Sequence, residues 1–133
     1  MPKASTSSVR ISSPRYGRTE VVRRLRTGAE RLREHLPLET LILFGSYATG
    51  RFTAASDIDI LVVHQDPPRP DAYALVRKTL GLRGLQPHVY ATTQAQGLRA
   101  VLSRMAALGV VIFQRAGRPF NENEVSRLDR GRR

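Results

Sequence analysis

Residues 44–59 read FGSYATGRFTAASDID and are the most informative part of this sequence. A Gly-Ser pair, Gly45 and Ser46, is followed after ten residues by an Asp-x-Asp pair, Asp57 and Asp59. The run before the first pair is apolar, and the run that contains the second is rich in β-branched residues. Such runs predict two buried strands, over 40–44 and 57–63, joined by a loop or a short helix.

The spacing of the two aspartates predicts a cation site. Residues two apart on a strand project from the same face, so the carboxylates of Asp57 and Asp59 lie side by side. Two like charges at that distance repel each other unless a cation lies between them. Mg²⁺ prefers carboxylates together with phosphate oxygens and waters, so it suits this pair.

The Gly-Ser pair predicts a phosphate site on the neighbouring strand. Gly45 lets the backbone approach a ligand closely, and the hydroxyl of Ser46 and adjacent backbone N–H groups can hold phosphate oxygens. Arg51, between the two pairs, is a further candidate phosphate contact. Each pair alone is more often an ordinary turn or a solvated pair. Their combination favours phosphoryl or nucleotidyl transfer from a nucleoside triphosphate.

The rest of the chain alternates between helical and strand patterns. Apolar spacing predicts helices over 19–35, 71–82 and 93–108, and short apolar runs predict strands over 88–91 and 110–113. The expected fold is α/β, of the α+β kind, with a small mixed sheet of about four strands flanked by helices. The folded domain is expected over 19–114, between a disordered basic arm, 1–18, and a flexible polar and basic tail, 115–133.

Composition excludes several classes of protein. The 133 residues suffice for one domain. Cysteine is absent, which excludes disulfides, zinc–thiolate sites and a cysteine nucleophile. No apolar run approaches the roughly 20 residues of a membrane helix. The N-terminus lacks the apolar stretch of a secretory signal, so a cytoplasmic location is expected.

Charge is the unusual property. Lysine and arginine number 22 against 11 acidic residues, a net charge of +11. Such a field attracts polyanions, and the basic arm and tail are candidates for weak nucleic-acid binding. A general bias toward arginine explains the same excess, so composition leaves both interpretations open.

The quoted residues resemble the minimal nucleotidyltransferase family of the DNA polymerase β superfamily, and the order of elements agrees from about residue 20 to 114. The resemblance implies that Gly45 and Ser46 bind the triphosphate, ATP being the first candidate. It implies that Asp57 and Asp59 bind catalytic Mg²⁺, with Mn²⁺ as the alternative. The reaction would transfer a nucleoside monophosphate to an acceptor hydroxyl. Minimal members are often paired with a helical HEPN-type protein, as antitoxins that AMPylate the toxin.

The chain departs from the family pattern at a third carboxylate, which usually lies on a later strand. His88 stands where that acid is expected, and no acidic residue occurs from 72 to 121. Only Asp66, Asp71 or a carboxylate of the tail remains as a substitute. His88 has three interpretations: a general base, a nitrogen ligand that Mn²⁺ tolerates better than Mg²⁺, or a structural replacement in a weakened enzyme.

Two functions therefore compete. The first is a Mg²⁺-dependent nucleotidyltransferase whose acceptor site is completed by a partner or by a second copy of the chain. The alternative is a binding module that keeps the fold, transfers poorly, and neutralises a HEPN-like helical protein through helix 19–35 or the run 110–113.

Overall fold

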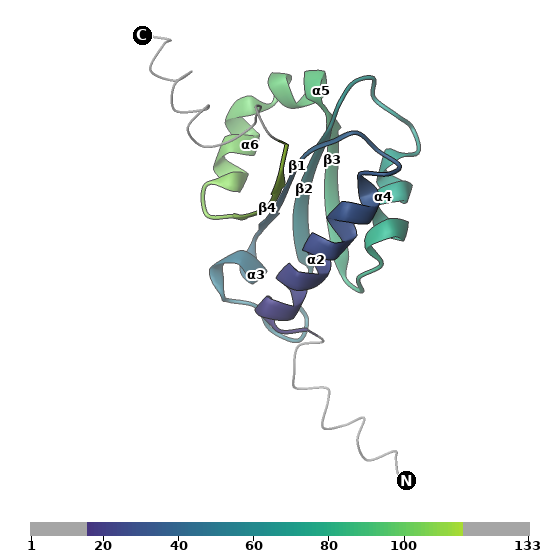
Figure 1. Ribbon diagram of the computed structural model, residues 1–133. Coiled ribbons are helices and arrows are strands. Elements are labelled where there is room, and N and C mark those ends of the chain that lie inside the picture. Colours follow the sequence, from purple (N-terminus) through teal and green to yellow (C-terminus); the bar gives the residue numbers. More distant parts are fainter. Residues whose placement is uncertain (1–15, 116–133) are drawn as a thin grey trace.

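A computed structural model describes residues 16–115, in which helices pack on both faces of one four-stranded sheet (Figure 1). The elements in chain order are α2 (Arg18–Leu32), β1 (Leu38–Phe44), α3 (Ser46–Thr49), β2 (Ile58–His64), α4 (Ala72–Leu80), β3 (Leu85–Ala91), α5 (Thr92–Gly97), α6 (Arg99–Ala106) and β4 (Val110–Gln114). The expected fold class is confirmed. Most of the basic arm and tail expected over 1–18 and 115–133 lies outside the described residues.

The sheet is mixed. Its strand order is β3-β2-β1-β4, with β1 antiparallel to both β2 and β4, and β2 parallel to β3. The strand expected over 88–91 begins earlier, at Leu85, and includes Pro87. Proline is tolerated there because β3 is an edge strand, whose outer N–H groups need no partner in the sheet.

One helix of the sequence analysis is two helices in the structure. The pattern over 93–108 predicts continuous helix, whereas α5 ends at Gly97 and α6 begins at Arg99. Leu98 between them has φ −114° and ψ 21°, outside helical geometry. Glycine is a weak helix former, and Gly97 is where the helical pattern breaks. The break turns α6 back toward the sheet, where Leu102 is fully buried.

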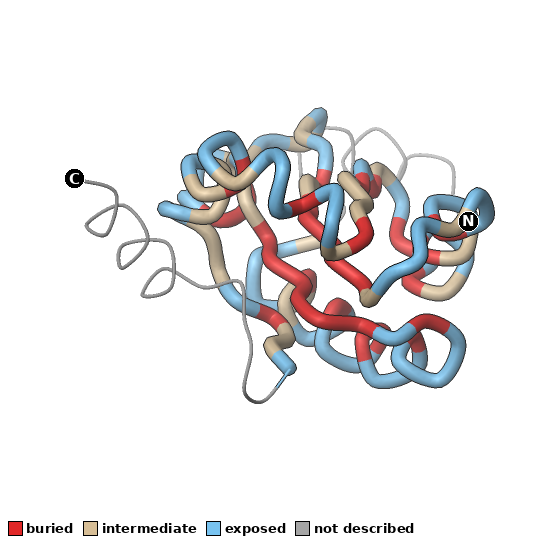
Figure 2. Tube along the Cα trace, turned by 90° about the horizontal axis from the view of Figure 1, so that it is seen from above, coloured by how far each residue is buried: buried red, intermediate tan, exposed pale blue. Residues whose placement is uncertain are grey.

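Two apolar layers hold the helices to the sheet. Helices α2 and α4 cover the face that carries Leu41, Leu43, Ile60 and other buried residues of the larger core. Helices α5 and α6 cover the other face, where the core contains Ile42, Leu61, Val63, Ala95 and Leu102. Figure 2 shows the buried residues along the strands, with the outer sides of the helices exposed. Of the helices in the described part, none is long and apolar enough to cross a membrane.

Candidate active site

The Gly-Ser turn lies directly against the Asp-x-Asp pair. Gly45 follows β1 with φ 76° and ψ −155°, a conformation that side chains rarely adopt. A Cβ atom at this position would lie 2.6 Å from Oδ2 of Asp59. Glycine is therefore required twice, for its backbone angles and for the space that the carboxylate occupies. The two halves of the motif, ten residues apart in sequence, form one site.

Strand register explains this contact. Phe44, the last residue of β1, pairs with Asp59 near the start of β2. Asp59 shares its sheet face with Leu61 and Val63, which α5 and α6 cover. Asp59 lies beyond that cover and is half-buried, and Asp57, just before the strand, is exposed. The site is thus at the uncovered end of one sheet face, where β1 ends and β2 begins.

The electrostatics of Asp59 favour a bound cation. Partial burial raises the pKa of Asp59, the negative charge of Asp57 raises it further, and the charge of His88 acts in the opposite direction. The ionised carboxylate is therefore unfavourable here without a positive charge nearby. Asp59 in β2 and Asp57 just before it offer hard oxygen donors, and the Gly45 backbone lies close to Asp59. These donors fit Mg²⁺, which is commonly bound by one or two carboxylates plus substrate phosphates. Within residues 16–115 no group of three or more acidic or histidine side chains forms a complete metal cage.

His88 lies beside the site on the neighbouring strand. In the parallel pairing of β2 with β3, Asp59 is opposite Gln86 and Leu61 is opposite His88, so all four share one face. The His88 ring packs against Phe44, with centroids 5.3 Å apart and planes tilted by 55°. Sequence reasoning identified His88 but missed Gln86, which is the direct neighbour of Asp59, and Phe44, which supports the His88 ring. Both contacts depend on which residues of neighbouring strands pair with each other. The residue pattern of a single strand does not contain that information.

The described alternatives for a third carboxylate lie elsewhere. Asp66 accepts hydrogen bonds from the backbone N–H and the hydroxyl of Thr93, at 3.1 and 2.6 Å. Asp71 forms an ion pair with Arg69 at 2.8 Å. Both follow His64, the far end of β2, which at about 3.3 Å per residue lies roughly 16 Å from Asp59. The structure therefore removes Asp66 and Asp71 as candidates, and the acidic residues of the tail lie outside the described part.

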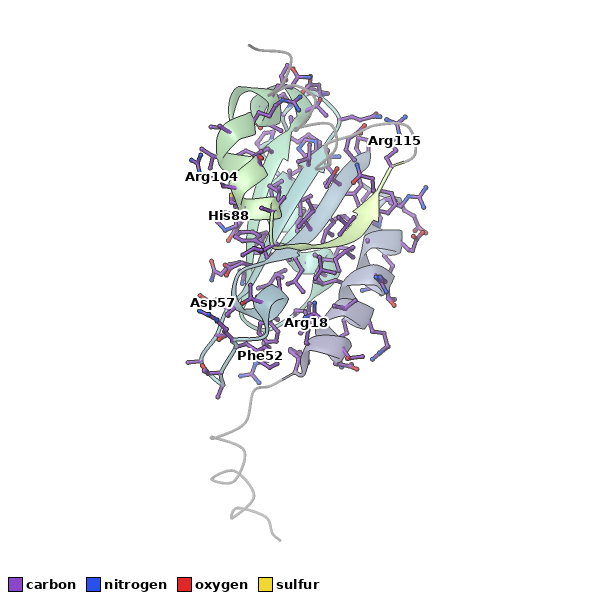
Figure 3. The ribbon with its side chains drawn as sticks, turned by 90° about the vertical axis from the view of Figure 1, so that its left-hand side faces the viewer. Arg18, Phe52, Asp57, His88, Arg104 and Arg115 are labelled. Carbon is purple, nitrogen blue, oxygen red and sulfur yellow. The ribbon has the colours of Figure 1, made fainter. Side chains whose placement is uncertain are left out.

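The short helix α3 is held in place from several sides. The side chain of Tyr47 is buried, stacks on Phe52 with centroids 4.3 Å apart, and donates its hydroxyl hydrogen to the carbonyl of Tyr16 at 3.0 Å. Arg18 Nε donates to the carbonyl of Tyr47 at 3.1 Å. Tyr47 thus anchors the turn. Figure 3 shows Arg18, Phe52 and Asp57 at one end of the molecule, away from Arg115.

Ser46 and Arg51 flank this helix. Ser46, half-buried, is its first residue, and its carbonyl accepts a hydrogen bond from the backbone N–H of Arg51 at 2.9 Å. This bond keeps Arg51 next to the turn, and its side chain is exposed. The roles of Gly45, Ser46 and Arg51 toward phosphate, and of Asp57, Asp59 and His88 in catalysis, remain predictions.

A mixed sheet that presents a Gly-Ser turn against an Asp-x-Asp strand is the arrangement of a nucleotidyltransferase domain. The model of the nucleotidyltransferase domain family matches residues 25–109, which is more than half of the chain, so this chain belongs to that family. No curated protein sequence matches the chain.

Solved structures share the fold at low sequence identity. One is a Sulfolobus solfataricus protein assigned as a nucleotidyltransferase, with 20% identity, a TM-score of 0.54, and coverage of 75% of this chain and 86% of the other. A second is a chain of a toxin–antitoxin complex with AMP-PNP, with 20% identity, a TM-score of 0.54, and coverage of 80% and 87%. A third comes from the complex of a tri-AMPylated Shewanella oneidensis HEPN toxin with its MNT antitoxin, with 20% identity, a TM-score of 0.53, and coverage of 83% and 87%.

Proposed function

We propose that this chain is a Mg²⁺-dependent nucleotidyltransferase that transfers a nucleoside monophosphate, AMP being the first candidate, to an acceptor hydroxyl. The close approach of the Gly45 backbone to the Asp59 carboxylate supports the proposal, because the Gly-Ser turn that we propose binds phosphate then lies next to a carboxylate that we propose binds the metal. Membership of the nucleotidyltransferase domain family supports the same reaction class.

The reaction assigns a role to each part of the site. The acceptor oxygen bonds to the α-phosphorus, the bond from that phosphorus to the oxygen bridging the β-phosphate breaks, and pyrophosphate leaves. Ser46 and the Gly45 backbone hold the phosphate chain, and Arg51 is placed to neutralise part of its charge. Asp57 and Asp59 would hold Mg²⁺, which supplies charge neutralisation at the phosphate oxygens when bound. In this proposal His88, which shares the sheet face of Asp59, would accept the proton of the hydroxyl.

We further propose that the acceptor belongs to a helical protein partner of the HEPN type. One structural neighbour is a complex in which a HEPN toxin is AMPylated and bound to an MNT antitoxin. This chain exposes apolar side chains on and around α6 and β4, namely Leu98, Val101, Leu108 and Val111. Four of the five exposed large apolar side chains of the described residues thus belong to the stretch 98–111, and exposed apolar surface of this kind is typical of a protein interface. We call these four residues the α6–β4 patch.

Transfer of label from [α-³²P]ATP tests the proposal. The chain is incubated with Mg²⁺ and the helical protein encoded by a neighbouring reading frame, and labelled protein is counted. Wild type is expected to label the partner, and Asp59→Ala to lower the rate by about 100-fold or more, the size of effect seen when charge stabilisation at a reacting centre is removed. Asp71→Ala, which removes an equal charge at the far end of β2, is the matched control. Equal labelling by wild type and Asp59→Ala would contradict the proposal.

The second candidate, a binding module, is favoured by one observation. The positions on β3 next to Asp59 carry Gln86 and His88, so the described chain offers no third carboxylate at the site. If this candidate is correct, the partner binds tightly, remains unlabelled, and binds Asp59→Ala as well as it binds wild type.

A further inference from the structure

The net positive charge of the described chain lies entirely on one layer. Helices α2 and α4 with the turns that follow them, residues 18–37 and 72–84, contain nine basic and three acidic residues. The remaining described residues contain five basic and five acidic residues, which balance. A general bias toward arginine would spread the excess over all surfaces. The observed asymmetry instead indicates a face built for a polyanion.

The two helices form a continuous surface. Gly28 of α2 faces Leu80 of α4 so closely that an added Cβ would lie 2.4 Å from Leu80 Cδ2, so glycine allows the helices to pack together. Arg31 Nη2 crosses to α4 and donates to the carbonyl of Thr79 at 2.9 Å. Figure 1 shows α2 and α4 side by side on the same face of the sheet.

A basic groove runs along this junction. Its volume is about 240 Å³, and it is lined by Arg23, Arg24, Thr27, Arg31 and Leu80. No acidic side chain lines it. We call this surface, together with the exposed Lys78 on α4, the α2–α4 basic face.

Local ion pairs leave much of this charge uncompensated. Glu20 pairs with Arg23 and with Arg24, and hydrogen bonds from both guanidinium groups lower the pKa of Glu20. Two arginines thus share one carboxylate. Lys78 is exposed and has no ion-pair partner among residues 16–115. Exposed pairs of this kind are weak, so a phosphate can compete for the same arginines.

We infer that the α2–α4 basic face binds the phosphate backbone of a double-helical nucleic acid. Helix α2 has 15 residues and is therefore about 22 Å long, enough to follow roughly six base pairs. Recognition of single strands usually needs exposed aromatic rings for stacking. Tyr73 is the one aromatic residue among the strongly exposed apolar side chains of the described chain, and Arg77 lies over its ring. Phosphate contact without stacking favours a duplex.

This face is separate from the candidate active site. Asp59 and His88 project from the sheet face that α5 and α6 cover, and α2 and α4 pack on the opposite face. Figure 3 shows Arg104 of α6 and His88 on one side of the molecule and α2 on the other. Duplex binding therefore does not depend on the proposed transfer reaction, and the two can be tested separately.

Fluorescence anisotropy with the full-length chain tests this inference. The probes are a labelled 20-base-pair RNA duplex, a DNA duplex of the same sequence and a single strand, each over a series of salt concentrations. We expect both duplexes to bind more tightly than the single strand. If about five phosphates are contacted, the slope of log K against log salt is about −4 to −5.

Matched variants locate the binding surface. Lys78→Glu and the double variant Arg24→Gln/Arg31→Gln each change the net charge by −2, and we expect each to weaken duplex binding by roughly tenfold. Arg104→Glu changes the charge by the same amount on α6, on the other side of the sheet, and should weaken binding by less than about twofold. Asp59→Ala should leave duplex binding unchanged.

Three results would overturn the inference. Absence of duplex binding at low salt is one, and an equal loss in Lys78→Glu and Arg104→Glu is another, because binding would then follow net charge alone. The third is stronger binding to vesicles containing anionic lipid than to either duplex, with the same dependence on Lys78, which would assign the face to a membrane surface.

Discussion

At the residue scale, the geometry of the candidate site depends on glycine at position 45, next to Asp59. The backbone angles of Gly45 and the 2.6 Å approach of a would-be Cβ to the Asp59 carboxylate make glycine necessary for two independent reasons. Gly50, five residues later, also has a positive φ of 85°, but an added Cβ would meet no atom within 4 Å. Substitutions at these two glycines therefore distinguish the effect of backbone strain, which both would cause, from displacement of the Asp59 carboxylate, which only a substitution at Gly45 would cause.

Gly45→Ala is expected to abolish metal-dependent nucleotide binding, because the new methyl group displaces Asp59. Gly50→Ala carries only the cost of an unfavourable φ, about 1–2 kcal/mol, and should retain binding. Thermal unfolding and nucleotide titration of both variants check this. Equal retention of binding would mean that the Asp59 position is not used for metal.

The residues on β3 beside Asp59 give a second prediction at this scale. His88→Asp places a carboxylate on the same face as Asp59, and Mg²⁺ prefers oxygen to nitrogen ligands. We expect Mg²⁺-dependent nucleotide binding to tighten by roughly tenfold, about 1.4 kcal/mol. Gln86→Asp, at the position opposite Asp59, is the comparison. If neither substitution changes the Mg²⁺ dependence, the third-carboxylate position is not on β3.

Part of the site could be predicted from single residues. The two-residue spacing of Asp57 and Asp59 keeps the two carboxylates near each other, and the charge of Asp57 acts on Asp59 in the structure. Gly45 directly follows its strand, as expected. The contacts of Phe44 with His88, and of Asp59 with Gln86, depend on how separate strands pair. That register is set by packing across the whole sheet, which local patterns do not contain.

Among the elements, the strands and helices were easier to predict than their ends. The order of helices and strands follows from apolar spacing. The break at Leu98 was missed because the apolar positions continue through it, and the early start of β3 was missed because Pro87 reads as a boundary unless the strand is known to be at an edge.

The start of α5 provides a test of pH dependence. Hydrogen bonds from the hydroxyl and the backbone N–H of Thr93 lower the pKa of Asp66. Because the folded-state pKa is below the unfolded-state value, the stabilisation is complete above the usual aspartate pKa of about 3.9 and is lost as pH falls through the lowered folded-state value. The difference in Tm between wild type and Asp66→Ala should thus be present near neutral pH and vanish in acid. A difference that does not change with pH would contradict this assignment.

At the scale of the whole molecule, three candidate functional surfaces lie on different parts of the domain. The candidate active site lies at one end of the sheet, the α6–β4 patch lies on one side, and the α2–α4 basic face lies on the other. Composition revealed the positive charge but not its location. Its concentration on one layer became visible only once α2 and α4 were placed together.

The α6–β4 patch is tested through Leu108, whose exposure of 75% leaves little packing to lose. Leu108→Asp should change the free energy of unfolding by less than about 0.5 kcal/mol, as is usual for surface substitutions. The Kd for the helical partner should rise by roughly tenfold or more, the range of a residue at the centre of an interface. Tyr73→Asp, an exposed apolar residue on α4, is the control. Equal effects of the two substitutions on the Kd would contradict the assignment of the interface to α6 and β4.

The central claim is that the Gly-Ser turn and the Asp-x-Asp strand form one metal-dependent triphosphate site. Isothermal titration calorimetry tests it most directly, with ATP and the other nucleoside triphosphates titrated into wild type, Asp59→Ala and Asp71→Ala, without metal, with Mg²⁺ and with Mn²⁺. We predict metal-dependent binding to wild type and Asp71→Ala that Asp59→Ala abolishes. Absence of binding to wild type with either metal, or undiminished binding to Asp59→Ala, would contradict the account.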